Sequence, residues 1–242
     1  MARIIADLDQ AVRLVFRAGR RLHTARRQVE RGQFTPGFPD RNLAQVERMM
    51  LTLVLGGARS GKSRYAQSLC ASSSDVIYFA TARTGGGEGD HEMLERIARH
   101  RADRPAEWQT VEEPLDLSRA VLEAPVEATL LIDCATLWIS NLMWEFREEP
   151  AAEQNMLIFA EVDDLIDAVR RRAEKSIATG AAGEVVIVSN EVGGGLVPEH
   201  PVARAFRDLQ GFANQSLARV ADRVVFIIAG LPLRLKPGAA VT

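Results

Sequence analysis

Residues 51–63 restrict the possible folds of this chain more than any other stretch. They read L-T-L-V-L-G-G-A-R-S-G-K-S: an apolar, β-branched run, then Gly56, four residues, and Gly61, Lys62 and Ser63. This is the P-loop pattern, in which a strand turns through a glycine-rich loop into a helix. The glycines let backbone N–H groups converge on phosphate oxygens, Lys62 reaches the terminal phosphates, and the Ser63 hydroxyl is placed for Mg²⁺.

A glycine turn without a ligand is the alternative interpretation of this stretch. The apolar run before it and the amphipathic run 65–69 after it match the strand and helix that a P-loop requires, and they favour nucleotide phosphate binding. The predicted phosphate-binding residues are Gly56, Gly57, Ala58, Arg59, Ser60, Gly61, Lys62 and Ser63.

Composition is that of one globular α/β domain with an appendage. The 242 residues are 47% hydrophobic and 26% charged, and the formal net charge of −2 gives no overall basic field for nucleic acid. No apolar run approaches the roughly 20 residues of a membrane span, and the first ten residues lack the features of a secretory signal. Cys70 and Cys134 are far apart in apolar settings, which predicts buried reduced thiols in a cytoplasmic protein.

Residues 1–50 differ from the rest in charge. They hold ten arginines and five acidic residues, a net charge of +5, which leaves −7 for residues 51–242. An amphipathic helix is expected first, and a linker follows at 32–39. We therefore predict an arginine-rich extension at 1–50 and a catalytic domain at 51–242. Three interpretations remain open: a solvated tail, a segment that binds RNA, anionic lipid or an acidic partner, and a true start at Met49 or Met50.

Strands and helices alternate after the P-loop. Apolar runs predict strands at 76–81, 108–111, 129–133, 184–189 and 223–229, and periodic segments predict helices at 90–101, 115–122, 136–146, 153–175 and 201–221. This order indicates a P-loop NTPase-like α/β fold, with a mostly parallel sheet covered by helices on both faces. The tail after Gly230 is expected to leave the sheet.

An acidic residue ends one of these strands. The run T-L-L-I-D finishes at Asp133, and downstream of a P-loop such a carboxylate commonly supports Mg²⁺. A strand followed by aspartate is common by itself, so the assignment of Asp133 as a Mg²⁺ ligand depends on the P-loop upstream. Ser63 and Asp133 are the candidate metal ligands.

His100 is the candidate nucleophile. It shares a helical face with Met93 and Ile97, which alone is typical of a packing residue. Its arginine neighbours change the interpretation, because nearby cations favour the neutral imidazole that can attack phosphorus. Farther along, the glycine-rich loop at 192–201 follows a strand, where substrate loops lie, although it can equally be a long connection.

Five blocks in order resemble the bifunctional adenosylcobinamide kinase and adenosylcobinamide-phosphate guanylyltransferase family of cobalamin biosynthesis. They cover most of residues 51–236: G-G-A-R-S-G-K-S-R, Y-F-A-T-A, E-M-L-E-R-I-A-R-H-R-A-D-R-P, the acid-ended strand with T-L-W-I-S-N-L, and V-S-N-E-V-G-G-G-L-V-P. The resemblance implies phosphorylation of adenosylcobinamide by a nucleoside triphosphate, ATP or GTP. It also implies GMP transfer from GTP through a GMP-histidine at His100, with Mg²⁺ accompanying the nucleotide.

The resemblance also implies further site residues and a homo-oligomer, a trimer in that family. Besides the P-loop, the implied nucleotide contacts are Ala80, Thr81, Ala82, Arg101, Arg104, Glu112 and Asp133. Residues 1–50 and the glycines at 85–89 fall outside the family pattern. Two alternatives remain: a P-loop small-molecule kinase in which His100 only packs, and a nucleotide-dependent switch that uses the basic N-terminus.

Overall fold

The computed structural model describes residues 49–83 and 104–236. The N-terminal extension, the segment with His100 and Arg101, and the last six residues lie outside this part. Its elements are β1 (Leu51–Gly56), α2 (Lys62–Cys70), β2 (Val76–Ala80), β3 (Gln109–Glu112), α4 (Leu117–Glu123), β4 (Thr129–Asp133), α5 (Ala135–Glu145), α6 (Ala151–Thr179), β5 (Val185–Asn190), α7 (Pro201–Val220), β6 (Arg223–Ile228) and β7 (Leu231–Lys236).

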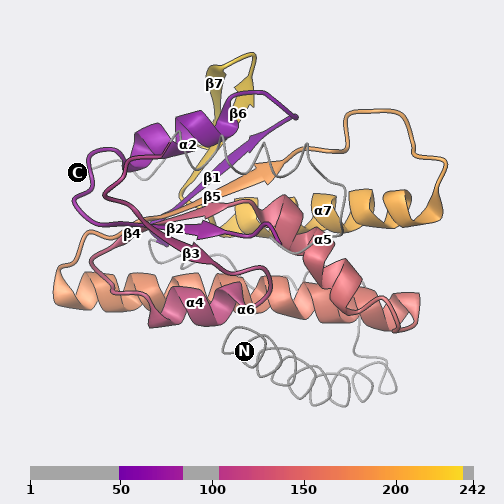
Figure 1. Ribbon diagram of the computed structural model, residues 1–242, viewed down its shortest axis with the longest axis horizontal. Coiled ribbons are helices and arrows are strands. Elements are labelled where there is room, and N and C mark those ends of the chain that lie inside the picture. The colour runs from indigo at the N-terminus through magenta and orange to yellow at the C-terminus, as the bar shows by residue number, and fades with distance from the viewer. Residues whose placement is uncertain (1–48, 84–103, 237–242) are drawn as a thin grey trace.

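The strands form one seven-stranded sheet with the order β3-β2-β4-β5-β1-β6-β7 (Figure 1). The six strands from β3 to β6 pair in parallel, so their carboxyl ends lie at the same edge. The strand β1 lies between β5 and β6. The next strand in the chain, β2, lies three positions away in the sheet, with the positions of β5 and β4 between them. The P-loop therefore begins in the interior of the sheet.

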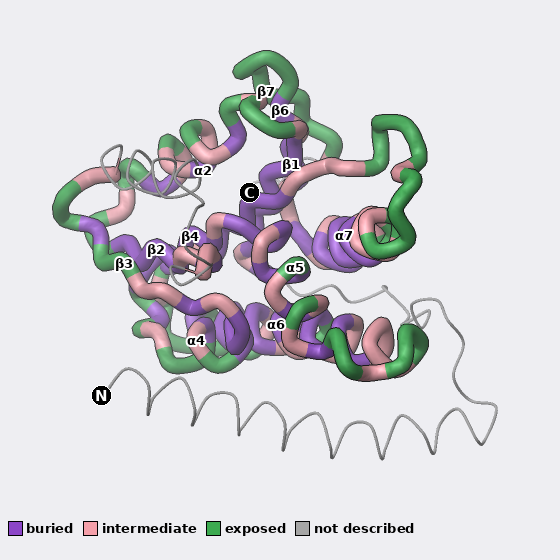
Figure 2. Tube along the Cα trace, turned by 45° about the vertical axis from the view of Figure 1, so that its right-hand side comes forward, coloured by how far each residue is buried: buried purple, intermediate pink, exposed green. Residues whose placement is uncertain are grey.

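Helices cover both faces of the sheet, as the sequence predicted. Helices α4 to α7 pack on one face, where Leu53, Ile132 and Ile187 belong to the larger core cluster. Helix α2 packs on the other face, where Val54, Tyr78 and Ala66 belong to a second cluster. Both faces of β1 are buried, which explains its mostly apolar sequence, with Thr52 as its buried polar residue (Figure 2). No described helix is long and apolar enough to cross a membrane.

The tail after Gly230 does not leave the sheet, contrary to the prediction. Ala229 and Gly230 have positive φ angles of 51° and 82° and form a tight turn, after which β7 pairs antiparallel with β6. Pro232 lies in this strand, which is tolerated because β7 is the edge of the sheet. The alternating sequence L-P-L-R-L-K leaves Leu231, Leu233 and Leu235 exposed.

A buried arginine fixes the connection between α4 and β4. Arg172 of α6 is 3% exposed, and its guanidinium donates to the carbonyl oxygens of Ala124 at 2.9 Å, Pro125 at 2.6 Å and Ala128 at 2.6 Å. Each carbonyl is part of an irregular segment that has no sheet partner of its own. Pro125 O also accepts from Ala128 N–H at 3.2 Å, so the arginine adds a second donor there and supplies a donor to the carbonyls of Ala124 and Ala128.

Arg172→Met should lower the free energy of unfolding by roughly 2–3 kcal/mol, because it keeps the apolar stem and removes three hydrogen bonds from a charged donor to backbone carbonyls. The neighbouring Arg171 is exposed, so Arg171→Met should change the free energy of unfolding by less than about 0.5 kcal/mol. Urea denaturation of both variants measures the difference. Equal losses in the two variants would contradict this role for Arg172.

Candidate functional site

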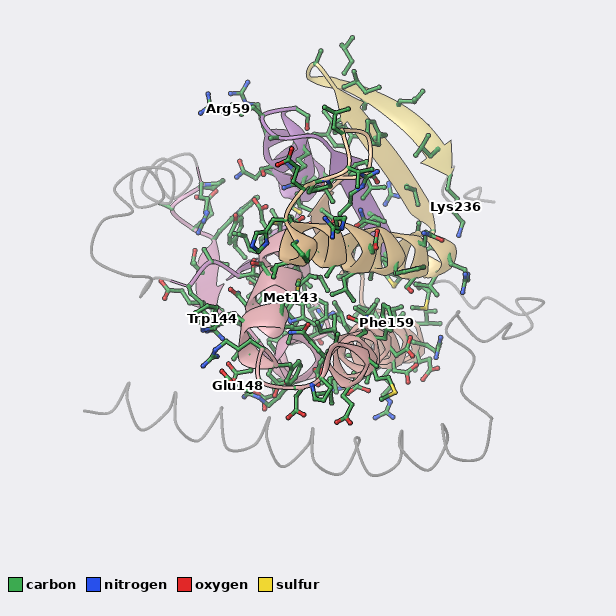
Figure 3. All side chains as sticks on the ribbon, turned by 90° about the vertical axis from the view of Figure 1, so that its right-hand side faces the viewer. Arg59, Met143, Trp144, Glu148, Phe159 and Lys236 are labelled. Atoms are coloured by element: carbon green, nitrogen blue, oxygen red, sulfur yellow. The ribbon has the colours of Figure 1, made fainter. Side chains whose placement is uncertain are left out.

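The P-loop is a tight turn between β1 and α2. Ser60 N–H donates to Gly57 O at 3.3 Å, and the Lys62 ammonium group folds back to donate to the same carbonyl at 3.1 Å. Arg59 and Gly61 have positive φ angles of 56° and 93°. At the end of the loop, Gly61 therefore has a conformation that glycine adopts without strain. Figure 3 looks onto the carboxyl edge of the sheet and shows Arg59 projecting outward from the loop.

Two neighbouring strand ends hold this loop in place. Glu191 N–H, just after β5, donates to Gly56 O at 3.1 Å, and Gly230 N–H, in the β6–β7 turn, donates to Ser60 O at 2.9 Å. A Cβ atom on Gly61 would lie 3.4 Å from the Cα of Gly230. The sequence analysis did not identify Gly230 as a residue that supports the P-loop. Its role depends on the β6–β7 turn, which the sequence analysis did not predict.

Asp133 lies at the carboxyl end of β4, opposite Ala80 of β2. Tyr78 donates its hydroxyl hydrogen to Asp133 Oδ2 at 2.8 Å, and the Arg104 guanidinium carbon lies 3.5 Å from the centroid of the Tyr78 ring. Arg104 also donates to Thr110 Oγ1 at 3.3 Å. The structure thus brings together Asp133 and Arg104, two of the predicted residues, through Tyr78, which the sequence analysis did not single out.

Thr81 joins two strand ends. Its hydroxyl donates to Cys134 O at 2.8 Å and accepts from Cys134 N–H at 2.9 Å, and Asn141 Nδ2 donates to Thr81 O at 2.8 Å. Ala80, Thr81 and Ala82 therefore lie at the carboxyl edge beside Asp133. The buried Thr81 hydroxyl is occupied by protein contacts.

The two adjacent glutamates after Val111 have different environments. Glu112 ends β3 and is partly exposed, with Ala80 as its backbone partner. Glu113 is buried, and its Oε1 accepts from Leu115 N–H at 2.9 Å and from Asp116 N–H at 2.8 Å. Glu113 thus fixes the turn into α4. Glu112, the predicted nucleotide contact, is the glutamate that lies at the carboxyl edge of the sheet.

Burial keeps the phenol and thiol groups near Asp133 protonated. Desolvation, with the Asp133 charge as the second cause, raises the pKa of Tyr78 far above its usual value. The same two causes raise the pKa of the Cys134 thiol to about 11. At neutral pH these groups act as hydrogen-bond donors or packing groups and not as bases. Both Cys70 and Cys134 are free and buried, as predicted.

A buried polar network fixes the end of β5. Asn214 Nδ2 of α7 donates to Asn190 O at 2.9 Å, and Ser189 Oγ donates to Asn214 Oδ1 at 2.7 Å. Gln210 Nε2 donates to Ser189 Oγ at 2.8 Å. This network was missed from sequence, although Gln210 and Asn214 are polar residues at i and i+4 on the core side of an amphipathic helix. It sets the point where the loop 191–200 begins.

That loop is also held by α7. Arg207 donates to Gly193 O at 2.9 Å and to Leu196 O at 3.3 Å, and Arg204 donates to Pro198 O at 3.0 Å. Its position after β5, next to the P-loop strand, is the one expected of a substrate loop. The substrate role itself stays a prediction.

Comparison with known proteins identifies the family. Residues 52–235 match the cobinamide kinase/cobinamide phosphate guanyltransferase family. The chain belongs to this family.

Three curated relatives agree with the assignment. The bifunctional adenosylcobalamin biosynthesis protein CobP of Pseudomonas aeruginosa is 42% identical over 77% of this chain and 98% of its own length. The proteins CobU of Escherichia coli and of Salmonella typhimurium are 37% and 39% identical, each over 77% of this chain and all of the relative. A prototypical ATPase of a type III secretion system is a solved structure similar over 77% of this chain and 57% of its own, at 13% identity and a TM-score of 0.45.

As a member of the cobinamide kinase/cobinamide phosphate guanyltransferase family, the chain is a phosphotransferase and nucleotidyltransferase of cobalamin biosynthesis. The P-loop described above is the element that binds nucleotide phosphates, as both activities require. Contacts of the strand-end residues with a nucleotide stay a prediction. His100 and Arg101, the remaining predicted residues, lie outside the described part of the chain.

Gly56→Ala should weaken GTP binding by about tenfold or more. A Cβ atom at Gly56 would lie 2.6 Å from Ser60 Oγ and 2.8 Å from Ile227 O, so the loop must move. Gly211→Ala on α7 is the matched control, because no atom lies within 4 Å of its Cβ position and Gly211 is not part of the P-loop. Isothermal titration with GTP measures both, and wild-type affinity in Gly56→Ala would show that the loop tolerates the shift.

Proposed function

We propose that a single nucleotide site at the carboxyl edge of the sheet serves both reactions, with His100 carrying GMP between GTP and adenosylcobinamide phosphate. The observation that supports this most directly is the position of Arg104. Its guanidinium packs on Tyr78, whose hydroxyl binds Asp133. Arg104 follows His100 by four residues, and four residues span at most about 14 Å. The described contacts therefore anchor the chain close to this edge just after the candidate nucleophile.

In the kinase reaction, the aminopropanol hydroxyl of adenosylcobinamide attacks the γ-phosphorus of a nucleoside triphosphate, ATP or GTP. The bond from this phosphorus to the β–γ bridging oxygen breaks, the nucleoside diphosphate leaves, and the hydroxyl proton is released. The protein contributes positioning and positive charge. Lys62 and the backbone N–H groups of the P-loop would hold the β- and γ-phosphates during this step.

In the guanylyl transfer, a nitrogen of the neutral His100 imidazole attacks the α-phosphorus of GTP. A nitrogen–phosphorus bond forms and pyrophosphate leaves. An oxygen of adenosylcobinamide phosphate then attacks the same phosphorus, which breaks the nitrogen–phosphorus bond and frees His100. Arg101 and Arg104 would stabilise the charge that develops on the phosphate oxygens.

Mg²⁺ is part of this proposal, and the described residues fit it. Protein-bound Mg²⁺ usually takes one or two protein ligands and fills its other positions with phosphate oxygens and water. Ser63 in the first turn of α2 and Asp133 at the strand end would be those ligands. Among the described residues no group of three or more His, Cys, Asp and Glu side chains could hold a metal by itself. When bound, Mg²⁺ supplies charge neutralisation at the phosphates.

We also propose that the protein is a cytoplasmic homo-oligomer, a trimer as the family resemblance implies. The apolar surface of the β6–β7 hairpin supports self-association, since Ile228, Leu231, Leu233 and Leu235 are all exposed. Burying such a row of aliphatic side chains against another copy would remove it from water.

Incubation with α-labelled GTP should attach acid-labile label covalently to the protein, and His100→Ala should abolish it. The same variant should still phosphorylate adenosylcobinamide, so that adenosylcobinamide phosphate accumulates. His200→Ala is the control, because His200 is an exposed histidine at the start of α7. Label that persists in His100→Ala would refute the assigned nucleophile. An unlabelled wild-type protein would favour the plain kinase.

Removal of residues 1–48 should leave kcat/KM for both reactions within about twofold. The predicted catalytic domain begins at residue 51, and the described chain already packs at Met49, which is buried and whose N–H donates to Asp222 Oδ1 at 3.4 Å. A steady-state assay of the shortened protein tests this expectation. A loss of more than tenfold would instead favour a switch that depends on the arginine-rich extension.

A further inference from the structure

Tyr78 connects two charged groups of the nucleotide site without belonging to the P-loop. It lies on β2, between β3 and β4, with Thr110 opposite on one side and Leu131 on the other. Asp133 is two residues beyond Leu131, so its side chain is on the same face of the sheet as Tyr78. At 2% exposure the ring is held in one position by the core on the α2 face.

The hydroxyl and the ring of Tyr78 act on different partners. The hydroxyl donates to Asp133 Oδ2 at 2.8 Å, which occupies one oxygen of this carboxylate. The ring supports the Arg104 guanidinium at 3.5 Å, a stacking geometry that favours a cation over an aromatic face. One side chain thus orients an anion and a cation that the proposed chemistry needs at the same edge.

The environment of Arg104 points toward a ligand. Its Nη1 donates to Thr110 Oγ1 at 3.3 Å, whereas its Nε is buried and has no hydrogen-bond partner within the described part of the chain. A buried guanidinium donor without an acceptor is costly, and a phosphate oxygen would satisfy it. The Tyr78 ring and Thr110 therefore hold this group in position before an anion arrives.

We propose that Tyr78 is a positioning residue for the metal–triphosphate complex. Its hydroxyl fixes Asp133 Oδ2 so that Oδ1 remains available to Mg²⁺, and its ring holds the Arg104 guanidinium toward the phosphates. This inference rests on the proposed nucleotide site. Neither part of Tyr78 touches the reacting atoms, so its effect passes through Asp133 and Arg104.

The hydroxyl and the ring can be tested separately by measuring GTP affinity with and without Mg²⁺ in the full-length protein. Tyr78→Phe keeps the ring and removes only the hydroxyl. It should leave GTP affinity without Mg²⁺ unchanged and reduce the gain on adding Mg²⁺ by roughly tenfold, the usual effect of losing a partner of a metal ligand. Tyr78→Leu also removes the ring, so GTP affinity should fall without Mg²⁺ as well.

Tyr65→Phe is the matched control, because Tyr65 is the other tyrosine of the chain and lies on α2, partly buried. It should match wild type in both conditions. In an Asp133→Asn background, Tyr78→Phe should have no additional effect on the Mg²⁺ gain. Asp133→Asn alone removes the proposed ligand and sets the largest loss of Mg²⁺ gain that Tyr78→Phe can show, and melting temperatures of all variants measure any loss of folding.

Two results would overturn the inference. One is a Mg²⁺ gain in Tyr78→Phe equal to that of Tyr65→Phe while Asp133→Asn reduces it. The other is an equal loss of affinity with and without Mg²⁺ in Tyr78→Phe, which indicates a purely structural role. Neither involves the covalent label at His100, so failure of this inference and failure of the proposed guanylyl transfer are distinguishable.

Discussion

Parallel pairing of β1 with β5 and β6 is the constraint on which the site depends. Gly56 lies opposite Asn190 on one side and Ile227 on the other, and Ala80 lies opposite both Asp133 and Glu112. Because parallel strands end at a common edge, this register alone brings residues from six strand ends together. Backbone hydrogen bonds within a buried sheet therefore determine where the P-loop, Asp133 and the loop 191–200 lie relative to one another.

Strands with strong local signals were predictable for the same reason. A strand buried on both faces must be apolar throughout, and β1, β2, β4 and β5 are short apolar runs that a period-based analysis finds within one or two residues. The edge strand β7 has the opposite character. It is exposed, contains Pro232 and alternates in polarity, so it lacks the burial signal, and the sequence predicts a departing tail in its place.

The residues of the site also fall into those that the sequence predicts and those that it does not. Residues that act within one local motif, such as Lys62 and Asp133, were predicted from sequence. Tyr78 and Asn214 were not, because each acts on a residue 55 or 24 positions away and has no motif of its own. Glu112 and Glu113 are adjacent and chemically identical, and only burial distinguishes the turn-forming residue from the residue at the edge.

The electrostatics of this edge explain how one loop can serve two chemistries. The chain is slightly acidic overall, but at the edge the neutral Tyr78 phenol and Cys134 thiol surround Asp133, with Lys62 and Arg104 as nearby cations. On the proposed function, such a site would bind a triphosphate and its metal without favouring attack at either the α- or the γ-phosphorus. On the proposed mechanism, the γ- and α-phosphorus atoms belong to the same bound chain of phosphates. The outcome then depends on the attacking group: a substrate hydroxyl at one end or the His100 imidazole at the other. If one phosphate-binding site serves both attacking groups, no second nucleotide site is needed. This is consistent with the one P-loop sequence in the chain.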